Sequence, residues 1–144
     1  MEKKKLGPDH YRYVDEICPT GLAVTCQRYV VVGETDQCWY ILSEFLDNLF
    51  GGSQREASVK KHRTRVLKAG GEHGRRYAYT DKELALGSYK HRKEWQMRHA
   101  QLSLERAKAA IGYFGDKTVQ ATVPAENSLI IPCEYVQAMN WSEC

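Results

Sequence analysis

Residues 80–112 read TDKELALGSYKHRKEWQMRHAQLSLERAKAAIG, and this stretch decides the fold that the sequence predicts. Thr80 and Glu83 have the spacing of a capping box, and the interior holds one glycine and no proline. Gly112 and Gly115 supply the stop signals of a helix end. The sequence therefore predicts one helix of roughly 45 Å, longer than the ~30 Å diameter of a small domain, so that part of it should project or meet a partner.

Apolar side chains fall on two nearly opposite faces of this helix when it is built with 3.6 residues per turn. One row consists of Leu86, Tyr89, Met97, Ala100, Leu104, Ala107 and Ile111. The other consists of Leu84, His91, Trp95, Leu102, Ala109 and Tyr113. A surface helix normally carries one apolar stripe, so we expect one row to pack on a sheet and the other on a second helix.

The second helix belongs either to this chain or to another subunit. No other long helix is visible in the sequence, which favours a homodimer or a higher homo-oligomer. The interface residues would be Leu84, Trp95, Leu102 and Ala109.

The residues before the long helix predict antiparallel strands. Residues 22–32 are rich in β-branched side chains and end at a glycine, and residues 38–42 form the next apolar run, so the two predict a hairpin. The apolar residues of 43–50 have helical spacing, and Ser43 is a suitable cap, which predicts a short helix.

The next segment predicts a polar loop over residues 53–58 and then a second hairpin. Its strands are residues 59–68 and 75–79, which flank a glycine-rich turn. After the long helix, residues 118–123 predict a short strand and residues 132–141 a helical turn.

These elements predict an α+β fold: an antiparallel sheet of about four to six strands with one long helix in the C-terminal half. The length of 144 residues predicts a single domain over residues 1–144. Hydrophobic content of 42% and charged content of 27% are those of an ordinary globular protein. No apolar run is long enough to span a membrane, and the basic start is not followed by a signal-peptide core, so we expect a cytosolic protein.

Neither metal nor cofactor is predicted. The five cysteines are odd in number, irregularly spaced and without a CxxC pair, which argues against a disulfide framework and a zinc site. The five histidines are scattered, and no GxSxG, HExxH or P-loop motif is present. We therefore expect a protein without catalytic activity.

Charge is distributed unevenly along the chain. The net charge is +3, but residues 55–79 hold 8 positive and 2 negative side chains, and residues 80–111 hold 7 and 4. The two flanking segments, 1–54 and 112–144, are net negative. The basic middle either binds an anionic partner or is neutralised by the acidic flanks.

Arginine and tyrosine are interleaved in the predicted second hairpin, and such a pattern suits phosphates and bases. Further basic residues lie on the long helix. The alternative is a solvated basic face. The candidate ligand-binding residues are Arg63, Arg65, Arg75, Arg76, Tyr77, Tyr79, Arg92 and Arg98.

One pattern resembles small early proteins of tailed bacteriophages, in which a strand enters a capped helix bearing an Arg-Lys-x-x-Gln segment. The residues that carry the resemblance are Tyr77-Ala78-Tyr79-Thr80, Leu84-Ala85, Ser88-Tyr89, Arg92-Lys93 and Gln96. The preceding hairpin, residues 28–41, is also similar. The order of a sheet followed by a long helix resembles the anti-Thoeris sponge proteins, which bind cyclic ADP-ribose signals and so block host immunity.

The resemblance implies a phage counter-defence protein in the bacterial host cytoplasm that sequesters a small anionic nucleotide at a dimer edge. Arginines would bind the phosphates, and Tyr77 or Tyr79 would stack on a base. Two alternatives stay open: a nucleic-acid-binding or nucleic-acid-mimicking regulator, and a protein inhibitor of a host defence enzyme.

Overall fold

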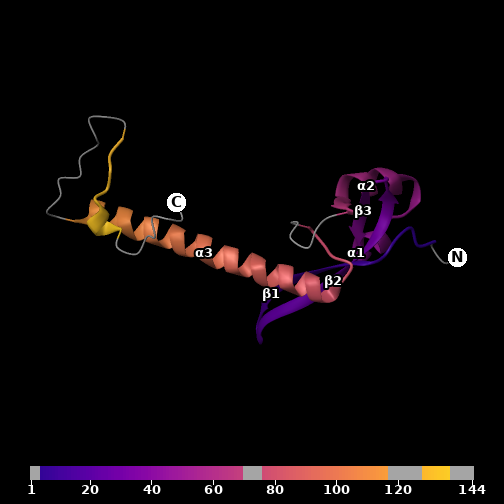
Figure 1. Cartoon of the computed structure of the whole chain (residues 1–144), viewed down its shortest axis with the longest axis horizontal. Coiled ribbons are helices and arrows are strands. Elements are labelled where there is room, and N and C mark those ends of the chain that lie inside the picture. Colours follow the sequence, from indigo (N-terminus) through magenta and orange to yellow (C-terminus); the bar gives the residue numbers. More distant parts are fainter. Residues whose placement is uncertain (1–3, 70–75, 117–127, 137–144) are drawn as a thin grey trace. The chain divides into compact units, whose positions relative to one another are not determined.

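The structure is a computed structural model that describes residues 4–69, 76–116 and 128–136. The chain divides into two compact units, Met1–His91 and Arg92–Cys144, and the boundary falls within the long helix. A sheet, two short helices and the start of the long helix belong to the first unit (Figure 1). The predicted α+β class, with an antiparallel sheet and one long helix, is confirmed. The prediction of a single domain stays a prediction.

Four antiparallel strands form the sheet in the order β1-β2-β3-β4. Strand β1 (His10–Cys18) pairs with the first part of β2 (Gly21–Glu34), and β3 (Cys38–Ser43) pairs with the last part. Tyr29 is the one β2 residue paired on both sides, with His10 and with Ser43. Beyond Tyr29 the register of β2 shifts between Val31 and Gly33, which marks a bulge.

The core lies on one face of this sheet. It consists of Tyr29, Val31, Ile41, Val66 and Ala78, with Trp39 packed against it. His10 is also buried and meets the ring of Trp39 edge-on, with the ring centroids 5.3 Å apart. Gly7 passes so close to this core that a Cβ there would lie 3.1 Å from Val31 Cγ2 and 3.2 Å from Trp39 Nε1. Only a residue without a side chain fits at that distance without moving its neighbours.

The short helix α1 (Glu44–Leu49) confirms the predicted one, and Ser43 caps it by accepting a hydrogen bond from the Leu46 amide at 3.3 Å. A 3-10 turn, η1 (Gly52–Gln54), follows, and then α2 (Arg55–His62). The prediction of a loop over 53–58 is therefore wrong, and the predicted strand over 59–68 is confirmed only at Thr64–Leu67. The alternation of basic and small residues that resembled a strand belongs to an exposed helix, where arginine, glutamate, alanine and lysine are good helix formers.

The predicted second hairpin is also wrong. Strand β4 (Thr64–Leu67) pairs with β3, whereas Tyr79 forms a single bridge with Tyr11 on the opposite edge of the sheet. Residues 76–79 thus do not return beside β4, and Ala78 is buried in the core. The predicted turn, Arg75 and the strand over 118–123 lie outside the described residues.

The long helix, α3 (Lys82–Gly115), begins two residues later than predicted. Asp81, not Thr80, caps it: its Oδ1 accepts hydrogen bonds from the amides of Glu83 at 2.7 Å and Leu84 at 3.4 Å. The first turns pack on the sheet of the first unit. Ala85 and Tyr89 are buried there, and the Tyr89 hydroxyl donates to Asp15 Oδ2 at 2.7 Å.

In the second unit, the segment around the 3-10 turn η2 (Cys133–Tyr135) packs on one face of α3. The Tyr135 hydroxyl donates to Asp116 Oδ2 at 2.6 Å, and this bond, with burial and nearby negative charge, raises the pKa of Tyr135 to about 12. The ring of Tyr135 meets Tyr113 edge-on and lies over Gly112. The described part of the predicted turn over 132–141 is confined to η2.

We expect Asp81→Ala to lower the free energy of unfolding by about 1 kcal/mol, because the first amides of α3 lose their side-chain acceptor. Thr80→Ala should have little effect. Denaturant melts of the two variants measure the difference, and a larger loss from Thr80→Ala would contradict the assignment of the cap.

A second prediction concerns His10. Burial lowers the pKa of His10. The hydrogen bond with the Pro8 carbonyl and the charge of Asp9 oppose this shift, whereas the charge of Arg76 adds to it. Below pH ~6.5 the unfolded chain binds a proton at this position that the folded chain does not. The contribution of His10 to stability should therefore be complete above that pH and be lost progressively as the pH falls below it.

Urea melts across this range test the idea. His10→Gln should flatten the pH dependence, whereas His99→Gln, at an exposed position on α3, should leave it unchanged. Equal slopes in wild type and His10→Gln would rule out His10 as the titrating group.

Candidate functional site

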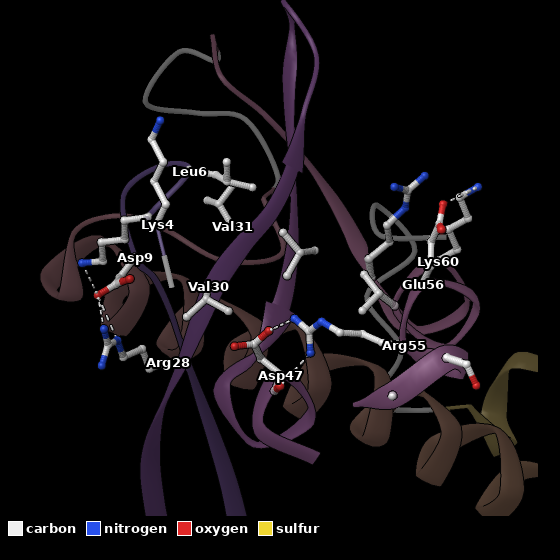
Figure 2. Close-up of a pocket in the computed structure, with 16 residues that line it drawn as sticks. Lys4, Leu6, Asp9, Arg28, Val30, Val31, Asp47, Arg55, Glu56 and Lys60 are labelled. Atoms are coloured by element: carbon white, nitrogen blue, oxygen red, sulfur yellow. Dashed lines mark hydrogen bonds and ion pairs between the residues drawn. The ribbon is translucent and has the colours of Figure 1, made fainter. Parts of the chain in front are cut away.

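A groove in the first unit has a volume of about 1400 Å³. Its floor is β2 at Val30, Val31 and Val32. One wall comes from the N-terminal residues and the other from α1, η1 and α2. Figure 2 shows the pair of Asp9 and Arg28 and the pair of Asp47 and Arg55 on either side of the strand.

The lining is more basic than acidic. Three carboxylates, Asp9, Asp47 and Glu56, are outnumbered by six cations. The cations are Lys4, Lys5, Arg28, Arg55, Lys60 and Arg63. These cations differ in their availability to a ligand, because some of them are held in ion pairs with carboxylates.

Arg28 fastens the N-terminal wall. Its guanidinium bonds Asp9 Oδ2 at 2.7 Å and Glu44 Oε1 at 3.1 Å, while Lys5 reaches the same oxygen of Asp9 at 3.1 Å. Burial alone would raise the pKa of Asp9, but the hydrogen bonds and charges of Lys5 and Arg28 outweigh it and hold that pKa below its usual value. These three residues join the N-terminal segment to β2 and α1.

Arg55 fastens the opposite wall. It contacts the buried carboxylate of Asp47 at 2.5 Å, and it donates to the carbonyl oxygens of Asp47 at 2.9 Å and Phe50 at 2.6 Å. Those carbonyls belong to the end of α1, where helix geometry leaves acceptors without backbone partners. Arg55 therefore serves the connection between α1 and α2.

Arg63 is different. Its guanidinium lies over the ring of Tyr40, 3.8 Å from the centroid, and no carboxylate pairs with it among residues 4–69, 76–116 and 128–136. The ring holds the guanidinium in a fixed plane while leaving its N–H donors for another acceptor. Lys60 is only loosely paired, 3.8 Å from Glu56 in an exposed position.

The structure separates the predicted ligand-binding residues. Of the seven that lie in the described residues, Arg63 alone lines the groove. Arg65 lies on β4 and donates from Nε to the Cys38 sulfur at 3.2 Å. The pKa of Cys38 is lowered, chiefly by its hydrogen bond with Thr35 and further by the bond from Arg65. Burial of the thiol opposes this shift. Arg75 lies outside the described residues.

Arg76, Tyr77 and Tyr79 lie beside β1 instead. Arg12 covers the ring of Tyr77 at 4.1 Å and donates to its carbonyl oxygen at 2.6 Å, and the backbone of Tyr79 pairs with Tyr11. Tyr77 also lines another hollow, of about 410 Å³, in which Arg28 is the one lysine or arginine among the described residues.

Arg92 and Arg98 belong to the part of α3 in the second unit. The guanidinium of Arg98 lies 5.3 Å from the ring of Trp95. Of the predicted interface residues, Leu84 and Trp95 are exposed, Leu102 is half-buried and Ala109 is buried. A partner could therefore not reach Ala109 at the surface.

Sequence reasoning missed most of the cations of the groove. Lys4, Lys5 and Arg28 lie in a segment that is net negative overall, so the charge distribution pointed away from them. The structure brings them to the groove because the segment 4–9 lies close to β2, where Gly7 approaches Val31.

No family model, curated protein or solved structure matches the chain. The groove must be interpreted from its own chemistry. In the described ranges, no helix combines the length and apolar character that a membrane span requires, and no three histidine, cysteine or acidic side chains meet in a metal-binding group. The four cysteines that these ranges contain are free thiols.

We expect Arg55→Ala to lower the free energy of unfolding by about 1–3 kcal/mol, because the buried Asp47 carboxylate loses a charged partner and two carbonyls lose a donor. The matched control is Lys60→Ala on the same helix, which removes an exposed cation and should stay within about 0.5 kcal/mol of wild type. Equal losses in the two variants would contradict the structural role of Arg55.

Proposed function

We propose that this protein binds a small phosphate-bearing ligand, a nucleotide, in the groove beside β2 and holds it without catalysis. The observation that carries the proposal is Arg63, a groove cation that is oriented by the ring of Tyr40 and has no carboxylate partner in the described part of the chain. A phosphate can accept two parallel N–H donors from such a guanidinium.

The rest of the groove supports this ligand class. Lys4 and Lys60 add positive charge on opposite walls, and the valine floor offers apolar surface to a base or a sugar. The ion pairs of Arg28 and Arg55 hold the walls in place before a ligand arrives, which reduces the entropy lost on binding. The lining as a whole is mixed: five apolar side chains lie among nine charged ones.

We further propose that binding serves sequestration. The resemblance of the sequence to phage early proteins and to cyclic ADP-ribose sponges suggests a cyclic nucleotide signal as the ligand and the bacterial host cytoplasm as the place. Under this proposal the protein needs tight binding and slow release, and no bond of the ligand is broken.

One observation favours a second candidate, a nucleic-acid strand. The groove volume of about 1400 Å³ exceeds the ~1000 Å³ upper range of small-molecule sites, so a longer phosphate chain would fill it better. The dependence of binding affinity on salt concentration distinguishes the two candidates. A strand that contacts several cations loses affinity steeply as salt rises, whereas a nucleotide loses less.

The test is Arg63→Ala, which should weaken nucleotide binding roughly 10–150-fold, as expected for the loss of one charge-assisted hydrogen-bonded contact. Arg65→Ala is the matched control: it removes the neighbouring arginine, which does not line the groove, and should leave affinity unchanged. Calorimetry against cyclic dinucleotides and cyclic ADP-ribose isomers measures both.

Binding of oligonucleotides but of no nucleotide would favour the second candidate. Equal affinities of wild type and Arg63→Ala would overturn the site. No binding of either ligand class would leave the inhibition of a host enzyme as the remaining hypothesis.

A further inference from the structure

A row of apolar side chains on α3 is left uncovered in the second unit. Met97, Leu104 and Ile111 are 69%, 53% and 75% exposed, and Phe114 is 53% exposed. Ala100 and Ala107 lie between them and are also exposed. The positions 97, 100, 104, 107, 111 and 114 alternate steps of three and four residues, which is the a/d pattern of a coiled-coil seam.

The opposite face of the same helix is already in use. Tyr135 packs over Gly112 and against Tyr113, and Ala109 is 5% exposed. Among the described residues of this unit, Ala109 is the one hydrophobic side chain that is fully buried. A helix owes most of its stability in water to packing of its apolar face, and this unit offers the seam no cover of its own in its described residues.

We propose that this seam pairs with the same seam of a second copy, with the two helices antiparallel. In that arrangement an a residue of one copy faces a d residue of the other. Leu104 faces Ala107, Ile111 faces Ala100, and Met97 faces Phe114, each pair being formed twice by the two-fold symmetry. The four central layers thus combine one large and one small side chain, which is how tightly spaced helices fill the space between them.

Parallel pairing would give a poorer fit. It places each residue against its own copy, so that two layers contain only alanines while Phe114 meets Phe114. Layers of such unequal volume leave cavities at one level and crowding at another. The sequence of the seam is therefore self-complementary in one direction only.

The residues flanking the seam do not oppose association. They are Gln96, Gln101, Ser103, Lys108 and Ala110. Lys108 is the one charged residue in this set, and in the antiparallel arrangement it lies near Gln101 of the other copy, so no like charges meet. The seam is about 27 Å long. An interface of this size is below the standard ~800 Å² per partner, so we expect a dimer of micromolar affinity.

Sedimentation of the full-length chain from about 1 to 100 µM tests the proposal. Wild type should pass from monomer to dimer, and Leu104→Asp should weaken association by about 100-fold or more, because it places two buried charges in the centre of the seam. Trp95→Asp is the control: it makes the same change on the opposite apolar row, where Trp95 is 41% exposed, and should leave the dimer intact.

A charge exchange tests the direction. Leu104→Lys and Ala107→Glu should each weaken self-association, and mixing the two variants should restore it at least 10-fold, because antiparallel pairing brings the new lysine of one copy against the new glutamate of the other. A mixture of Leu104→Lys with Ala100→Glu should stay monomeric, since these positions do not face each other.

A wild-type chain that remains monomeric at 100 µM would overturn the dimer, and so would dissociation by Trp95→Asp but not by Leu104→Asp. A wild-type dimer in which the first mixture fails to associate would overturn the antiparallel arrangement. Circular dichroism of each variant confirms that α3 is still folded.

Discussion

The double pairing of Tyr29 is the constraint on which the first unit depends. Up to Tyr29, β2 pairs with β1; from Tyr29 onward it pairs with β3. The two hairpins therefore share one strand but overlap at a single residue. The core forms around that residue, with Tyr29, Val31 and Ile41 on one face of the sheet. The described residues that precede His10 form no strand beside β2, and the groove lies there, over Val30, Val31 and Val32.

Ion pairs then decide which of the groove's charges are structural. Arg28 and Arg55 each bridge two segments of the chain and contact partly or fully buried carboxylates, so their charge is largely compensated before any ligand binds. Arg63 is oriented by an aromatic ring instead, which fixes its position without neutralising its charge. A count of basic residues cannot distinguish these two situations, because the difference lies in what each guanidinium contacts. The net +6 of residues 55–79 therefore does not by itself identify which cations of that segment are available to a ligand.

The parts of the fold that the sequence predicted well are those determined by local patterns. The β2–β3 hairpin, the Ser43 cap and the long helix each follow from spacing within a few residues. The errors have specific causes. Asp81 and Thr80 are both good caps, and the choice between them depends on where the backbone turns after Tyr79 bridges to Tyr11. The basic residues of α2 were predicted as part of a strand because no side chain of this helix is buried, so its sequence shows no apolar stripe with helical spacing. The groove itself combines residues from Lys4 to Arg63, and no local pattern connects them.

Gly7 illustrates how a residue that does not line the groove controls its shape. The N-terminal wall can approach β2 only because nothing larger than a hydrogen atom separates the Gly7 backbone from Val31 and Trp39. A Cβ at this position would require the Gly7 backbone or the side chains of Val31 and Trp39 to move by a few tenths of an ångström. The packing of Gly7 on the core thus determines how closely the N-terminal wall lies to β2. A substitution at Gly7 would therefore alter the groove without changing any of its basic residues.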